Sequence, residues 1–427
     1  MLTPEREDEP PRTVFVAAHA WVDDLAGGSF KLATEFAESL AGRGRRVHYI
    51  CCGHERSPPP RTVERGVTVW RYPRPPGRGP FALWGHVRGT AAAVRRTLAE
   101  AGPPDCLNGH TPLQFAGALR GLRGAKSGAG GAVRTVYTVH SPFADEFAAE
   151  GRRGPRSWST RVAAALEGRN CRRADAVTGD STFTLRRLRA LYPGIKTLRD
   201  APVGGASVCP GWVAVDQFRV ADDRPALRAQ LGGAWADAAG EPTFFTLRRL
   251  HRRMGLDLLI DAAAALDRSG ARFRLLIGGG GPLRGELQTR IDALGLSGRV
   301  TLLGFVPDED LPRCYAAADC FVLPTRDLEC FGLIILESYA AGVPVIATPV
   351  AAIPELVTLA GDEWLTDVAS AEALAERMRA FLSGRIAADP AELRGIAEGF
   401  DRPTGVSALE SVCLSGPLVP SHAPIPA

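Results

Sequence analysis

The segment from Leu323 to Glu337 reads LPTRDLECFGLIILE and lies between two short apolar runs, at residues 320–323 and 343–347. Apolar runs of this length, bounded by turn residues, are typical of buried strands, and residues 332–341 carry apolar side chains at helical spacing. A strand, a crossover helix and a second strand form a β-α-β unit, whose strands are parallel. The segment therefore predicts an α/β fold with a doubly wound sheet.

The same alternation extends in both directions along the chain. Strands are expected at 13–19, 47–52, 67–72, 106–110, 135–139, 176–178, 243–247, 273–277 and 300–304. Helices are expected at 30–42, 87–101, 158–173, 182–192, 255–269, 283–294 and 309–317. Because 427 residues are too many for one ordinary core, we expect two Rossmann-like domains that face each other across a cleft.

Composition shifts set the expected boundaries. They are a flexible leader 1–12, an N-terminal Rossmann-like domain 13–205, an interdomain segment 206–222, a C-terminal domain 223–390, a helical segment 391–415 and a disordered tail 416–427. The last of these is rich in proline, which disfavours a packed core.

The overall composition is that of a globular protein, with 45% hydrophobic and 23% charged residues. No apolar run is long enough for a membrane span, and the first twelve residues lack the apolar core of a secretory signal. The nine cysteines show no zinc-site spacing. We therefore expect a cytoplasmic protein with reduced thiols and no structural metal.

The stretch from Arg120 to Asp200 is locally basic, with sixteen Lys or Arg against seven Asp or Glu. An arginine-rich solvated face is the simplest interpretation, and a peripheral membrane contact is the alternative. Nucleic acid is not an expected partner, because neither an aromatic-rich platform nor a zinc finger accompanies the charge.

Two glutamates stand eight residues apart in the opening segment. Glu329 falls at a strand-to-helix turn, and Glu337 lies about 12 Å further along the helix axis. That span suits a sugar at one end and a ribose at the other, with a diphosphate at the helix N-terminus formed by Phe331, Gly332 and Leu333. A solvated helix face is the alternative, but apolar residues surround both carboxylates.

A second polar segment, from Thr246 to Leu256, follows one strand and precedes a helix. It contains Arg249 and Arg253, whose planar guanidinium groups can bind phosphate through two hydrogen bonds. No lysine exists beyond Lys196, so any phosphate held by the second half must be held by arginine or backbone. A solvated basic turn is the alternative.

Two features of the first half point to the same chemistry. Gly27 and Gly28 follow the first strand, and their backbone amides can approach an anion closely. His140 ends the strand 135–139, where it either contacts a ligand or serves a structural role. Each feature taken alone is weak.

Together these motifs resemble the Glu-x7-Glu signature of retaining glycosyltransferase family 4, over about residues 13–400. The resemblance implies a GT-B fold, with Glu329 at the donor sugar, Glu337 at the ribose and Arg249 at the diphosphate. It also implies that the Gly27-Gly28 loop closes on the phosphate and that His140 lies near the sugar. The chain departs from the family at Cys330, where glycine is usual, and at Met254, which stands at the position of a lysine. Arg253 is the expected replacement for that lysine.

The resemblance implies transfer of a sugar from a UDP- or GDP-linked donor to an acceptor hydroxyl, with retention and without a cofactor. No catalytic metal is expected, because Asp308-Glu309-Asp310 falls where a helix needs an N-terminal cap. The glycines at 278–281 imitate a dinucleotide fingerprint, but the next strand, 300–304, ends without the acidic residue that would bind a ribose. A sugar-nucleotide epimerase and a catalytically silent sugar-nucleotide-binding scaffold are the rival functions.

The acceptor is the least determined partner. Asp23 and Asp24 precede the Gly27-Gly28 loop, and Asp145 and Glu146 follow His140. Four carboxylates at one mouth would suit a cationic acceptor such as an amino-sugar or aminocyclitol. Ordinary solvated loop charge is the alternative, and a polysaccharide, a lipid or a small neutral acceptor stays open.

Overall fold

The computed structural model describes residues 11–414, except 26, 55–58, 78, 128–130, 150–156, 196, 198–205 and 239. The chain divides into two compact units. Among the described residues, the first unit runs to Gly211 and also includes residues 403–414, and the second spans Trp212–Arg402. The expected tail 416–427 and most of the expected leader 1–12 lie outside the described residues.

The first unit is built on a sheet with the strand order β3-β4-β2-β1-β5-β6-β7-β8. Its strands are β1 (Thr13–Ala17), β2 (Arg46–Cys52), β3 (Arg61–Glu64), β4 (Val67–Tyr72), β5 (Cys106–Gly109), β6 (Arg134–Val139), β7 (Ala176–Gly179) and β8 (Ala206–Val208). All neighbours are parallel except β3 and β4. The order reverses between β1 and β5, so the sheet is doubly wound, as predicted.

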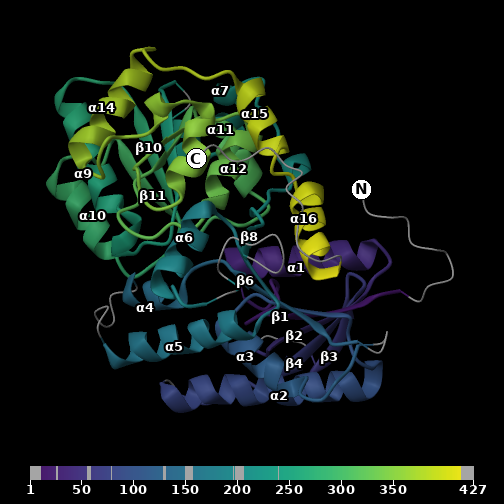
Figure 1. Cartoon of the computed structure of the whole chain (residues 1–427). Helices are drawn as coiled ribbons and strands as arrows, with labels where there is room; N and C mark the ends of the chain where they lie inside the picture. Colours follow the sequence, from purple (N-terminus) through teal and green to yellow (C-terminus); the bar gives the residue numbers. More distant parts are fainter. Residues whose placement is uncertain are drawn as a thin grey trace. The chain divides into compact units, whose positions relative to one another are not determined.

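Helices cover both faces of this sheet. They are α1 (Gly28–Gly42), α2 (Pro80–Ala101), α3 (Pro112–Gly121), α4 (Phe143–Ala149), α5 (Trp158–Arg173), α6 (Thr182–Leu191) and α16 (Arg402–Leu414). Helix α1 buries Leu32, Phe36 and Leu40, which recur every four residues along one helical face. Helices α2, α3 and α5 pack side by side, with α2 outermost in the view of Figure 1.

The second unit contains a smaller, fully parallel sheet with the order β11-β10-β9-β12-β13. Its strands are β9 (Thr243–Leu247), β10 (Arg274–Gly278), β11 (Val300–Gly304), β12 (Cys320–Leu323) and β13 (Val345–Ala347). Strands β9, β10, β12 and β13 are almost entirely buried, as expected for a parallel sheet covered on both faces, whereas the edge strand β11 is only partly buried. Here the order reverses between β9 and β12, which makes the gap between those strands the topological switch point.

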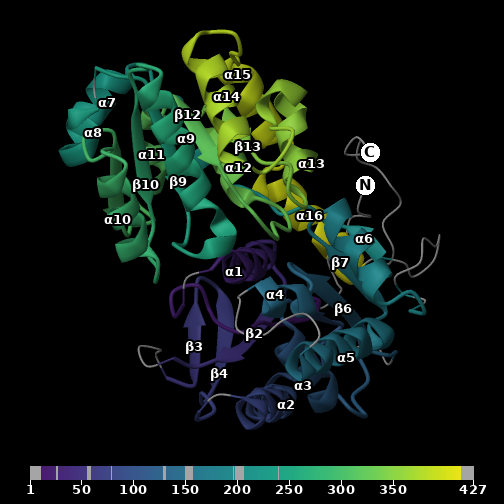
Figure 2. The same cartoon turned by 90° about the vertical axis from the view of Figure 1, so that its left-hand side faces the viewer.

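The helices of the second unit fall into two packed groups, which lie on the left and on the right of the sheet in Figure 1; Figure 2 shows the same elements turned by 90°. The α-helices are α7 (Arg224–Leu231), α8 (Gly233–Asp237), α9 (Leu256–Arg268), α10 (Arg284–Ala293), α11 (Leu311–Ala317), α12 (Leu333–Ala340), α13 (Ile353–Val357), α14 (Ala371–Leu382) and α15 (Pro390–Glu398). Short 3-10 helices are η2 (Val215–Gln217), η3 (Arg252–Met254), η4 (Thr358–Ala360) and η5 (Asp362–Trp364). Helices α9, α10 and α14 form one group, and α7, α11, α12 and α15 form the other.

The last helix belongs to the first unit, although the sequence grouped residues 391–415 as one segment. Arg43 and Arg45 contact the carboxylate of Glu410 on α16 at 2.6 and 3.0 Å, and the Glu410 side chain is only 2% exposed. Arg134, at the start of β6, donates to the carbonyl of Val412 at 2.7 Å. These ion pairs and this hydrogen bond hold α16 against the first sheet.

Candidate active site

The carboxyl ends of β9 and β12 meet at the switch point of the second sheet, where ligands of doubly wound folds bind. Arg248 is the first residue after β9, and a turn from Pro324 to Gly332 joins β12 to α12. Leu328 and Gly332 adopt positive φ angles of 50° and 93° in this turn. The backbone therefore changes direction sharply in this turn, and Glu329 lies within it, between the strand and the helix.

Glu329 is paired with Arg248. Nη2 of Arg248 lies 2.7 Å from a carboxylate oxygen of Glu329 and 3.1 Å from Oγ1 of Thr325. The two charged side chains are only 8% and 18% exposed. Nε of Arg248 is buried and has no hydrogen-bond partner among the described residues. An oxyanion next to Glu329 would give this donor a partner.

The sequence selected Arg249 and missed Arg248. Arg249 is exposed, whereas its neighbour is partly buried and holds Glu329. Successive side chains of an extended segment point in opposite directions, so only one of two adjacent arginines can pair with Glu329. The alternation of side chains along a strand predicts that only one of the two arginines faces Glu329. The sequence does not show which one, because it does not determine how the alternation continues beyond the end of β9.

The glycines at 278–281 support this arginine segment. Arg248 N donates to Gly278 O at 3.0 Å, and Leu250 N donates to Gly280 O at 2.9 Å. A Cβ atom on Gly279, whose φ is 118°, would overlap the carbonyl oxygen of Arg248. The glycine turn therefore allows a close approach of two backbone segments at the switch point.

Arg253 and Met254, at the position where the family has a lysine, have different surroundings. Nη1 of Arg253 donates to the carbonyl of Leu328 at 2.7 Å, and its own carbonyl accepts from Arg326 N at 2.9 Å. Met254 is 4% exposed and packs in the core of the second unit. Arg253 thus holds the backbone of the Glu329 turn.

Glu337 lies on α12, is 8% exposed and accepts a hydrogen bond of 2.8 Å from the hydroxyl of Tyr315. Burial, together with this carboxylate, raises the pKa of Tyr315 well above its ordinary value, so the phenol stays a donor. Phe331 is 6% exposed and packs in the core, while Leu333 begins α12. Cys330, the departure from the family, is also buried.

Three side chains of the first unit meet at one edge of its sheet. His110, His140 and Asp180 are each the first residue after adjacent parallel strands, β5, β6 and β7. Nδ1 of His140 lies 2.8 Å from Asp180 Oδ2, and its Nε2 lies 2.9 Å from Nδ1 of His110. Their equal positions after neighbouring strands were a sequence signal for all three residues, of which only His140 was predicted.

Burial affects the ionisation of His110. Desolvation lowers the pKa of His110 well below its ordinary value, so its ring is neutral. Nε2 of His140 and Nδ1 of His110 share one hydrogen bond, whose direction depends on the tautomers of the two rings. Nε2 of His110 is then left buried without a partner among the described residues.

Gly27 and Gly28 lie at the N-terminus of α1 and are exposed. A Cβ atom on Gly27 would approach the ring of Phe30 to 3.0 Å, which is closer than ordinary contact. The amides of this first turn lack side-chain caps in the described part of the loop. The loop therefore presents helix N-terminal donors to solvent, as an anion site requires.

The four acidic residues expected at the acceptor side are not a set of free carboxylates. Asp24 is 3% exposed and bonds Arg71 at 2.7 Å, and Asp145 bonds Arg187 at 2.6 Å. Asp23 accepts from Arg65 at 2.7 Å. Glu146 lies half-buried on α4. Asp23, Asp24 and Asp145 are therefore each paired with an arginine of the first unit.

One smaller expectation concerns the N-terminus of α11. Asp310 occupies the N-cap position of α11, but its side chain makes no capping hydrogen bond.

Among the residues that the structure describes, no group of three or more His, Cys, Asp or Glu side chains is arranged to hold a metal ion. Nor does this part of the chain contain a helix that is both long and apolar enough to span a membrane.

Comparison with known families matches both units. The family described as "Glycosyl transferase 4-like domain" matches residues 27–199, and the one described as "Glycosyl transferases group 1" matches residues 233–395.

Two curated relatives share sequence with part of the chain. The GDP-mannose-dependent alpha-(1-6)-phosphatidylinositol monomannoside mannosyltransferase of Mycobacterium tuberculosis is 35% identical over 190 residues, which are 43% of this chain and 46% of the relative. The alpha-D-kanosaminyltransferase of Streptomyces kanamyceticus is 34% identical over 146 residues, 34% of this chain and 37% of that relative. The chain thus spans less than half the length of either relative.

Solved structures resemble the whole chain. The sucrose-phosphate synthase of Thermosynechococcus elongatus has a TM-score of 0.75 at 22% identity, covering 94% of this chain and 98% of that one. Anabaena HepE, in complex with UDP and glucose, has a TM-score of 0.70 at 20% identity, covering 94% and 99%. At these identities the likeness establishes the fold. With both units matched by glycosyltransferase families and the whole chain matched by their fold, the protein belongs to the family-4 type of GT-B glycosyltransferases.

Proposed function

We propose that the protein transfers a hexosyl group from a nucleoside diphosphate sugar to an acceptor hydroxyl, with retention of anomeric configuration. The observation that carries this proposal is the pair of Arg248 and Glu329 at the switch point, with Glu337 further along α12. A carboxylate and an unsatisfied guanidinium N–H at the mouth of a doubly wound sheet suit the sugar and the phosphate of one donor.

Each residue of the proposed donor site has a distinct task. Glu329, oriented by Arg248, would accept hydrogen bonds from the sugar hydroxyls, and Glu337 would accept them from the ribose. Arg248, exposed Arg249 and the amides at the start of α12 would stabilise the charge that grows on the departing diphosphate. Arg248 would thereby supply the positive charge that the buried Met254 cannot supply.

Retention does not require a protein nucleophile in this proposal. The acceptor hydroxyl attacks the anomeric carbon on the face that the diphosphate leaves, and a phosphate oxygen takes the hydroxyl proton. The glycosidic bond forms as the bond between sugar and phosphate breaks, so atoms and charge balance without a metal. His140, held by Asp180 and His110, stays the candidate for a further sugar contact.

GDP-mannose and UDP-glucose are the first donors to examine. One relative is named as GDP-mannose-dependent, and one structure of similar fold contains UDP and glucose. For the acceptor, the ion pairs of Asp24 and Asp145 favour a neutral glycan, lipid or small molecule over a cationic one. All nine cysteines are buried and form no disulfide in the described part of the chain, which supports a reducing compartment such as the cytoplasm.

A panel of UDP- and GDP-linked sugars, with release of the nucleoside diphosphate as readout, tests the proposal. We expect release that depends on an added acceptor and a product with the anomeric configuration of the donor. Conversion of the donor sugar to its epimer without acceptor would indicate an epimerase. Binding of a donor without turnover, under every acceptor tried, would indicate a silent scaffold.

A further inference from the structure

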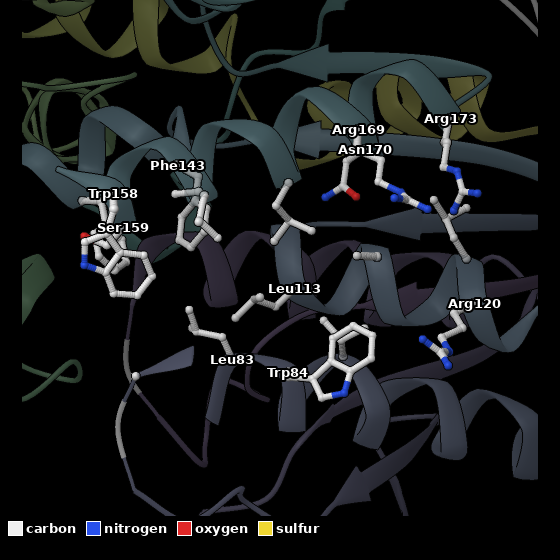
Figure 3. Close-up of a pocket in the computed structure, with 18 of the residues that line it drawn as sticks. Leu83, Trp84, Leu113, Arg120, Phe143, Trp158, Ser159, Arg169, Asn170 and Arg173 are labelled. Carbon is white, nitrogen blue, oxygen red and sulfur yellow. The ribbon is translucent and has the colours of Figure 1, made fainter. Parts of the chain in front are cut away.

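The first unit contains a large apolar groove that the proposed donor site does not use. The groove has a volume of about 570 Å³ and lies among helices α2, α3, α4 and α5 (Figure 3). This volume is in the range of ligand-binding cavities. Its apolar lining includes Leu83, Trp84, Leu113, Phe143, Trp158 and Val162.

Large apolar side chains of this groove are open to solvent. Trp84 is 49% exposed, Trp158 is 56% exposed and Val162 is 50% exposed. Contiguous exposed apolar side chains mark sites of interaction, whereas apolar side chains that are exposed singly are common on protein surfaces. Tryptophan in particular is enriched where an apolar phase meets water.

Four arginines line the same groove: Arg120, Arg123, Arg169 and Arg173. All four are exposed, and none makes an ion pair among the residues that the structure describes. The guanidinium of Arg120 lies 5.2 Å from the ring centre of Trp84. The groove therefore combines an apolar lining with uncompensated positive charge.

The charges gather toward one end of the groove. In Figure 3, Arg120 and Arg173 lie at the end opposite Phe143 and Trp158. Helix α3 ends at Gly121 and α5 ends at Arg173, just before β7 begins, so this end lies at the amino-terminal edge of the sheet. His140 follows β6 at the carboxyl-terminal edge. The cationic end is thus a site apart from the histidine triad.

We propose that this groove binds one anionic lipid drawn from a membrane, with its hydrocarbon chain along the apolar lining and its phosphate among the four arginines. An acidic peptide fits less well, because a peptide backbone needs hydrogen-bond partners wherever it is buried. The lining offers few of them, and the side-chain amide of Asn170 already donates to the carbonyl of Pro112 at 2.8 Å. A hydrocarbon chain has no such requirement.

The tryptophans of the chain supply a direct readout. The other five, at positions 21, 70, 212, 235 and 364, are each at most 5% exposed. Phosphatidylglycerol with brominated acyl chains quenches tryptophan only at close range, so quenching in mixed phosphatidylcholine vesicles reports chain entry at Trp84 and Trp158. We expect quenching with brominated phosphatidylglycerol and none with vesicles of brominated phosphatidylcholine alone. Sedimentation with the anionic vesicles but without quenching would overturn the groove as the binding site.

Matched variants on α5 separate the groove from general surface charge. Arg169→Gln/Arg173→Gln removes two lining charges, and Arg161→Gln/Arg172→Gln removes two exposed charges of the same helix outside the lining. We expect the first pair to weaken vesicle binding by about thirtyfold, at roughly a factor of five per charge, and the second by less than about threefold. Equal losses in both pairs would refute the proposal.

A second pair of variants tests the apolar lining. Val162→Asp puts a carboxylate into the groove, whereas Phe81→Asp changes a residue of α2 that is 92% exposed and outside the lining. We expect quenching to be lost only in Val162→Asp, with both variants keeping the wild-type melting temperature within a few degrees. Loss in Phe81→Asp with retention in Val162→Asp would refute the proposal. The readout is lipid binding, so it stands independently of sugar transfer.

Discussion

Replacing Arg248 by glutamine removes the charge that orients Glu329 and leaves the rest of the turn in place. The guanidinium lies 2.7 Å from the carboxylate, and the two side chains are 8% and 18% exposed. Breaking a fully buried pair by removing one partner costs about 3–5 kcal/mol. Because Glu329 keeps some contact with water and glutamine can still donate a neutral hydrogen bond, we expect a stability loss of about 2 kcal/mol.

The catalytic effect has a separate origin. A hydrogen bond to a charged group contributes about 1.5–3 kcal/mol, and Arg248 would make one to the diphosphate through its unpartnered Nε. A loss of about 2 kcal/mol corresponds to a drop of roughly thirtyfold in kcat/KM. Release of nucleoside diphosphate measures this drop, and urea unfolding measures the stability of the same preparation.

Arg252→Gln is the matched control, because Arg252 lies in the same segment but is 79% exposed and pairs only with surface Glu286. We expect Arg252→Gln to change kcat/KM and the free energy of unfolding little, since exposed ion pairs contribute at most about 1 kcal/mol. The double variant Arg248→Gln/Glu329→Gln should lose less than the sum of the two single variants. Wild-type kcat/KM in Arg248→Gln, with the variant folded, would refute the assigned role.

Three further outcomes follow from the same geometry. Glu329→Gln should keep nucleotide affinity but lower turnover at least tenfold, about 1.4 kcal/mol of transition-state energy, and full activity would remove Glu329 from the site. Asp24→Asn should destabilise the first unit by about 3 kcal/mol in urea unfolding, because it breaks the buried pair with Arg71, and wild-type stability would contradict that pairing. Burial raises the pKa of Glu167 from 4.5 to about 7. Between these pH values the folded chain therefore binds more protons than the unfolded chain. The free energy of unfolding then falls as pH rises through this window, by up to about 3 kcal/mol. Glu167→Gln should abolish that decline when urea unfolding is compared at about pH 5 and about pH 8, and an unchanged decline would assign it to other groups.

The sequence predicted the sheets well, because the apolar runs that build parallel strands are buried on both faces and stand out locally. It missed β3, whose residues Arg61–Glu64 alternate between exposed and half-buried positions. This strand runs antiparallel to β4 at the sheet edge, and its Val63 is 67% exposed. An edge strand of four residues with so little burial has no local signal to distinguish it from a loop.

The sequence indicated which segments carry the candidate site residues, but not how the charged side chains pair. The glutamates are recognisable because their spacing is local, whereas the partner of Glu329 comes from a segment 81 residues away. The partner of Asp24 is likewise 47 residues away, so the sequence treated a neutralised carboxylate as free. Assignment of α16 to the first unit depends on the same kind of long-range contact, through Glu410. Local patterns determine which elements form, but not which charges meet.

The proposed donor site is tested most directly by measuring donor binding and turnover by wild type, Glu329→Gln and Glu337→Gln with the same nucleotide sugar. We predict that Glu337→Gln weakens binding of the free nucleoside diphosphate, because its carboxylate would contact the ribose. Glu329→Gln should leave that binding intact and slow release of the diphosphate in the presence of acceptor. Unchanged binding and turnover in both folded variants would contradict a donor site at the end of β12.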